Sequence, residues 1–104
     1  MSDRISQLRE ILAHAPGDKM ARYALAMEYL SGGEMESAIG ELAGLVSDHP
    51  DYVPAYQMLA QTLLRHGDET RAREVLEKGI RTAAASGNAH AQSEMQGMLD
   101  EMGE

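Results

Sequence analysis

Apolar side chains recur every three or four residues along most of the chain, which is the spacing of one face of an α-helix. The first segment shows this face through Ile5, Leu8, Ile11 and Leu12. No segment alternates apolar and polar residues over the length of a strand, so we expect no sheet. The pattern predicts six helices, over residues 2–15, 19–31, 34–48, 52–66, 69–85 and 88–102.

Short polar or glycine-containing breaks separate the predicted helices. Gly33 and Gly67 follow the second and fourth helices, where a left-handed residue commonly ends a helix. Asp18, Asp51 and Asp68 each precede a predicted helix, where a carboxylate can accept a hydrogen bond from a free backbone N–H. We therefore expect these three residues to cap the second, fourth and fifth helices.

Matching residues recur at a spacing of 34 along the chain. They are Leu8, Leu42 and Leu76; Leu12, Val46 and Ile80; Leu25 and Leu59; Ala26 and Ala60; Ala38 and Ala72; Gly33 and Gly67; and Pro16 and Pro50. A fixed period of this length indicates stacked helix pairs rather than one irregular core. The repeated alanines supply the small side chains that two closely packed helices need.

These residues resemble the tetratricopeptide repeat family, whose unit has 34 residues. Residues 19–52 match one unit and residues 53–86 a second, residues 1–16 look like the second half of a preceding unit, and residues 88–102 look like a capping helix. The resemblance implies a single all-α domain, built as a right-handed α-solenoid of antiparallel helix pairs with about six helices. Arg22 departs from the family pattern, because a large aromatic residue is common at its place.

The sixth predicted helix does not continue the period of 34, so it resembles an atypical terminal helix. One of its faces is apolar, through Ala91, Met95, Met98, Leu99 and Met102. We expect this face to pack on the fifth helix, against Val75, Leu76 and Ile80, because an apolar stripe of this size rarely stays exposed. The alternative is that the sixth helix occupies the concave groove of the solenoid.

Charge and composition narrow the classes of partner. The chain has 104 residues, of which 17 are acidic and 9 basic, for a formal net charge of −8. Nucleic acids and anionic membranes repel such a chain, so we predict neither as a partner. There is no Cys, no leader-like basic and apolar start, and no stretch long enough to span a bilayer. These absences favour a cytoplasmic location.

Candidate catalytic and metal-binding residues are few. The four histidines lie near predicted helix ends, and none has a second ligand at the spacing of a metal site. The paired carboxylates lie where predicted helices begin, which helix dipoles explain. We therefore predict no catalytic residue, no metal and no cofactor, and an enzyme is the least favoured class.

The resemblance also implies a binding face, because the first helix of each unit lines the concave side of the family's solenoid. The positions carried over are Met20, Tyr23, Met27 and Leu30 in the first unit, and Gln57, Gln61, Leu64 and Arg65 in the second. An apolar helix or an extended peptide would suit this strip, so the implied function is a module, or scaffold, that binds a protein or peptide. The alternative is a self-associating structural module, either a homodimer or a piece of a longer repeat array.

Overall fold

The computed structural model describes residues 3–103, which form six α-helices and no strand. The helices are α1 (Asp3–His14), α2 (Lys19–Ser31), α3 (Met35–Asp48), α4 (Val53–Arg65), α5 (Glu69–Ala85) and α6 (Ala89–Glu101). Each predicted helix is present, with its ends within one residue of the prediction where both can be compared. The predicted start of the first helix, at residue 2, lies outside the described residues.

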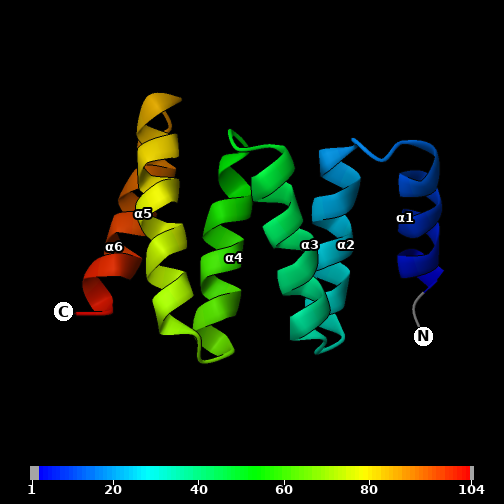
Figure 1. The fold of residues 1–104 in the computed structure, drawn as a ribbon, viewed down its shortest axis with the longest axis horizontal. Coiled ribbons are helices and arrows are strands. Elements are labelled where there is room, and N and C mark those ends of the chain that lie inside the picture. Colours follow the sequence, from blue (N-terminus) through cyan, green and yellow to red (C-terminus); the bar gives the residue numbers. More distant parts are fainter. Residues whose placement is uncertain (1–2, 104) are drawn as a thin grey trace.

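The helices form an elongated stack that measures 41 × 28 × 19 Å along its principal axes. Successive helices run antiparallel, with α1 at one end of the long axis and α5 and α6 at the other (Figure 1). Each helix packs against the next along the chain, and α4 additionally contacts α6. This arrangement confirms the predicted all-α solenoid of antiparallel helix pairs.

Three helices begin at a polar side chain that caps their first turn. Asp18 and Asp68 accept hydrogen bonds from the backbone N–H groups of Ala21 and Arg71, at 3.1 and 3.2 Å, as predicted. Asn88 caps α6 in the same way through the N–H of Ala91. These bonds satisfy backbone donors that a helix start leaves free.

The predicted cap at Asp51 is wrong. Helix α4 begins at Val53, the residue at its cap position is Tyr52, and no side chain accepts a capping hydrogen bond there. The reason lies in the first turn of α4. Pro54 has no N–H to donate, and the N–H of Ala55 already donates to the carbonyl of Tyr52 at 3.2 Å. A carboxylate near this helix start has little left to accept.

Glycine turns and buried alanines hold the helix pairs together as expected. Gly33 and Gly67 have φ angles of 78° and 90°, in the left-handed region that favours glycine. Ala38 and Ala72 are fully buried where the two helices of each pair meet. Because a side chain of one methyl group sits at each crossing, the helix backbones can approach closely.

Arg22 on α2 shows how the chain replaces the expected aromatic residue. Its guanidinium lies against Gly44 of α3, where even a Cβ atom would clash with it. Nε donates to Oε1 of Glu41 at 3.0 Å, and Nη1 donates to Oδ2 of Asp48 at 2.9 Å. A half-buried, doubly paired arginine therefore joins α2 to α3.

Helix α6 matches α2 and α4 in length, and it follows α4 at a spacing that the sequence pattern missed. Helices α2, α4 and α6 each have 13 residues, and α6 begins 36 residues after α4 rather than 34. At this spacing Met95 corresponds to Leu59, and both side chains are buried. The two extra residues arise because α5 has 17 residues where α3 has 14, while the connection that follows it is one residue shorter.

The contact predicted between the sixth helix and the fifth is confirmed. Met95 is fully buried in a cluster with Tyr56 of α4 and Leu76 of α5, and Val75 and Ile80 pack against this cluster. Gly79 of α5 makes the approach possible, because a Cβ atom there would lie 2.7 Å from the sulfur of Met95. Helix α6 therefore packs mainly on α5.

Candidate functional site

The predicted binding strip starts on α2 with one strongly exposed side chain and three half-buried ones. Met20 is 72% exposed, the highest value among the large apolar side chains that the structure describes. Tyr23, Met27 and Leu30 are half-buried. Leu30 packs against the core cluster at the α1 end of the stack, so it belongs partly to the fold.

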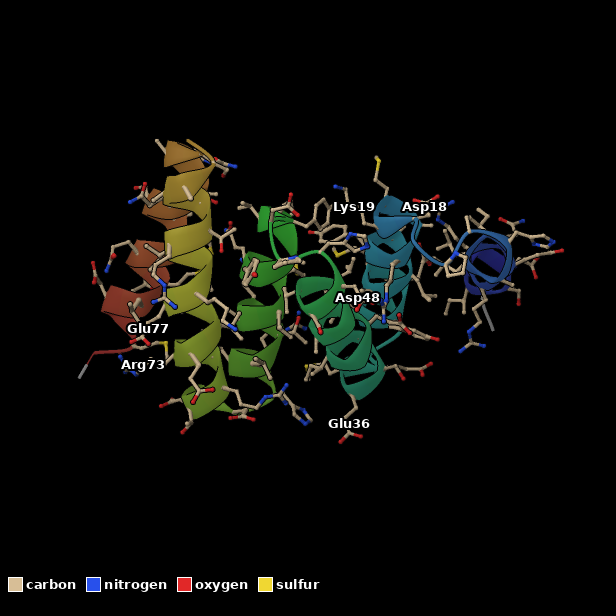
Figure 2. All side chains as sticks on the ribbon, turned by 45° about the horizontal axis from the view of Figure 1, so that its top comes forward. Asp18, Lys19, Glu36, Asp48, Arg73 and Glu77 are labelled. Atoms are coloured by element: carbon tan, nitrogen blue, oxygen red, sulfur yellow. The ribbon has the colours of Figure 1, made fainter. Side chains whose placement is uncertain are left out.

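Tyr23 of α2 contacts Tyr52, the residue that precedes α4. Its ring meets that of Tyr52 edge to face, with 5.9 Å between the ring centroids. The ammonium of Lys19 lies 5.4 Å from the centroid of the Tyr52 ring, and Figure 2 shows Lys19 at the start of α2. Burial, and secondarily the phenol of Tyr52, raise the pKa of Tyr23 above its ordinary value of 10.0. This aromatic pair therefore ties α2 to the residue that precedes α4.

The second half of the strip lies on α4, beside α6. The Gln57 amide donates to Oε1 of Glu94 at 2.8 Å, which links the two helices on their exposed side. Nε2 of His90 lies 3.1 Å from Oε2 of the same Glu94. The side chain of Gln57 is thus hydrogen-bonded to α6. Gln61, Leu64 and Arg65 lie further along α4 and line a groove.

This groove, called the α4–α6 groove below, has a volume of about 500 Å³. Its apolar lining comes from Leu64 of α4, Met98 of α6 and Met102, which directly follows α6, and all three are half-buried. Its polar lining consists of Gln61, Arg65, Glu69 and Glu101. The volume lies within the range of small-ligand pockets, and an open groove of this kind can also take one or two side chains of a bound segment.

The structure thus brings together three of the eight predicted residues and adds four that the prediction missed. Gln61, Leu64 and Arg65 share the groove, and none of its lining residues comes from α2. The prediction missed these four because they lie on α5, on α6 or directly after α6, outside the positions carried over from the family: Glu69, Met98, Glu101 and Met102. The spacing of 36 between α4 and α6 would have found Glu101, which corresponds to Arg65, but not Met98 or Met102.

The end of α6 is fixed against α5, so the lining of the groove is held in place. Arg73 of α5 donates through Nη2 to the carbonyl of Gly103 at 3.2 Å, and Figure 2 shows Arg73 beside the end of α6. Gly103 itself has a φ of 74°, like the glycines that follow α2 and α4. Met102 packs against both core clusters that meet at α4 and α5.

The described residues contain no group of three or more His, Asp or Glu side chains placed to hold a metal ion. His66 pairs with Glu36 at 3.8 Å and His90 with Glu94 at 3.1 Å, in both cases between exposed side chains. None of the helices in the described part of the chain is long and apolar enough to cross a membrane.

Comparison with known proteins gives consistent matches. The family model for the tetratricopeptide repeat matches residues 5–60 and again 29–93. A TPR repeat-containing protein of Pseudomonas aeruginosa is 32% identical over 91 residues, which cover 88% of this chain and 87% of that protein. The solution structure of a tetratricopeptide repeat domain protein from Salinibacter ruber is 31% identical, with a TM-score of 0.79 over 83% of this chain and 87% of that one. A Bordetella parapertussis protein is 26% identical, with a TM-score of 0.80 over 97% of this chain and 88% of its own.

Proposed function

The chain belongs to the tetratricopeptide repeat family, and we propose that it is an interaction module that binds a segment of another protein on its concave face, lined by α2, α4 and α6. Tetratricopeptide repeats are a non-catalytic fold that generally mediates protein–protein interaction. In this proposal α1 is the second half of a unit, α2–α3 and α4–α5 are two full units, and α6 caps the stack.

The observation that carries the proposal is the α4–α6 groove. It combines apolar side chains with amide and guanidinium donors on rigid helices, which is the composition of a surface that recognises a peptide. Arg65 can donate to main-chain carbonyls of a bound segment, and Gln61 can both donate and accept. Tyr23, Met27 and the exposed Met20 would extend the contact along α2.

The experiment is selection of peptides from a displayed random library on the immobilised protein, followed by affinity measurement with labelled peptides. Arg65→Ala should weaken binding of the selected peptides about fivefold or more, because a truncated interface anchor commonly costs more than about 1 kcal/mol. Gln61→Ala should weaken it in the same direction. Arg81→Ala, at an exposed position of α5 that does not line this groove, is the matched control.

Selected peptides that bind all three variants as tightly as the unmodified chain would refute the proposed site. Circular dichroism of each variant shows whether the helices are intact, so a loss of binding can be separated from a loss of folding.

The second candidate function is self-association, which the exposed Met20 and the 46% exposed Ile11 favour. Light scattering coupled to size-exclusion chromatography over a range of concentrations distinguishes the two. A dimer that dissociates on Met20→Ser and loses no peptide affinity would place self-association on α2 and leave the groove for a partner.

A further inference from the structure

The charged side chains of the α4–α6 groove have no partners within the described chain. Arg65, Glu69 and Glu101 are exposed, and the structure gives none of them an ion pair or a side-chain hydrogen bond. Glu94 of α6, which does not line the groove, differs because it pairs with His90 and accepts a hydrogen bond from Gln57. The groove therefore offers two free carboxylates and one free guanidinium beside its apolar lining.

The sign of the charge favours a basic occupant. Two carboxylates against one guanidinium leave the groove negative, on a chain whose formal net charge is already −8. An acidic segment would be repelled both by the groove and by the whole molecule. A second copy of this chain would bring the same excess of negative charge.

The apolar lining of the groove favours a bound segment that also carries an apolar side chain. Leu64, Met98 and Met102 are half-buried, and unbranched methionines can adjust to side chains of different shape. A purely apolar segment, however, would cover Glu69 and Glu101 without offering them a partner, and burying an unpaired charge is unfavourable. Lysine or arginine on each side of the apolar anchor removes this cost.

We infer that the α4–α6 groove binds a protein segment in which an apolar side chain is flanked by lysine or arginine. This inference rests on the proposed function and names the chemistry of its partner. The apolar side chain contacts Leu64, Met98 and Met102, the flanking cations pair with Glu69 and Glu101, and Arg65 donates to main-chain carbonyls of the segment.

The test uses three labelled synthetic peptides with the same central leucines, flanked by lysine, by serine or by glutamate. Their affinities for the full chain are measured by fluorescence anisotropy at low and at high salt. We expect the lysine-flanked peptide to bind tightest and to lose affinity as salt rises, because exposed charges are screened within about 10 Å at 0.1 M salt. The glutamate-flanked peptide should bind weakest.

Charge-neutralising variants locate the effect. Glu69→Gln and Glu101→Gln should each weaken the lysine-flanked peptide about two- to fivefold, the range for one exposed ion pair, and leave the serine-flanked peptide unchanged. Glu10→Gln, an exposed position on α1 at the opposite end of the stack, is the matched control. Thermal melts verify that Glu69→Gln, which removes a carboxylate from the first turn of α5, stays folded.

Three results of the peptide measurements would overturn the inference. Equal affinities of the lysine- and glutamate-flanked peptides, or lysine-flanked binding that Glu69→Gln and Glu101→Gln leave unchanged, overturn the inference. If the serine-flanked peptide still binds and Arg65→Ala weakens it, the proposed function survives that result. Binding by none of the three peptides overturns the inference, and the library selection described above then decides the proposed function separately.

Discussion

Adding one methyl group at Gly79 tests how closely α6 packs on the rest of the stack. Gly79 is buried within α5, and a Cβ atom there would lie 2.7 Å from the sulfur of Met95 and 2.8 Å from the Cβ of Tyr56. The thioether can swing away, but Tyr56 Cβ is fixed to the backbone of α4. The substitution Gly79→Ala therefore forces α4 and α5 apart, and α6 with them.

Two opposing terms set the size of the effect. Alanine improves helix propensity by about 1 kcal/mol, whereas overpacking a filled core costs about 1–3 kcal/mol. Gly40→Ala is the matched control, because Gly40 is an exposed helical position in α3 with nothing within 4 Å of its Cβ site. Gly40→Ala should raise the free energy of unfolding by about 1 kcal/mol. The free energy of unfolding of Gly79→Ala should be lower than that of Gly40→Ala by about 1–3 kcal/mol.

Urea unfolding followed by circular dichroism measures both variants under the same conditions. If Gly79→Ala stabilises the chain as much as Gly40→Ala does, then α6 and α4 do not approach α5 as closely as described, and the lining of the α4–α6 groove is placed wrongly.

Three further predictions address other parts of the fold. Ala38→Leu and Ala72→Leu should each lower the free energy of unfolding by about 1–3 kcal/mol, since both alanines are fully buried at helix crossings, and unchanged thermal melts would contradict that packing. Stability should fall as the pH rises above about 10, because the raised pKa of Tyr23 makes the folded chain hold its phenolic proton longer than the unfolded chain does; Tyr23→Phe should reduce this fall in alkaline urea titrations. Removing residues 88–104 should uncover Leu76 and its neighbours, so the shortened chain should melt lower and associate, and a monomeric form of unchanged stability by light scattering would show that α6 contributes little.

The helices and their pairing could be predicted because the relevant signals are local or strictly periodic. Gly33 and Gly67 end their helices through a backbone conformation that glycine adopts without strain. Ala38 and Ala72 repeat at the unit length, and their burial follows from the geometry of one helix crossing repeated in the next unit. Interactions of this kind depend on few residues, so they can be recognised without coordinates.

The features that could not be predicted depend on geometry that accumulates along the chain. The extra length of α5 shifts α6 by two residues relative to the repeat, so a search at a fixed spacing aligned the wrong residues of the last helix. The missing cap at Asp51 follows from the place of Pro54 in the first turn of α4, which a local rule for capping residues does not include. The pairing of Arg22 over Gly44 joins residues from two helices and needed the packed structure.

The α4–α6 groove could not be predicted for the same reason, because it depends on where α6 packs. Gln96 corresponds to Ala60 of α4 at the spacing of 36, and Ala60 corresponds to Ala26 of α2. Both alanines are fully buried, whereas Gln96 is exposed and donates a hydrogen bond to Asp100 at 3.0 Å. One side of α6 thus packs as a repeat helix does, through Met95, while another side is polar. The packed side of α6 holds this helix against α5. Met98 and Met102 therefore lie beside α4 and complete the α4–α6 groove. The groove is therefore a product of where α6 stacks, and substitutions that loosen this stacking should weaken partner binding even where they touch no groove residue.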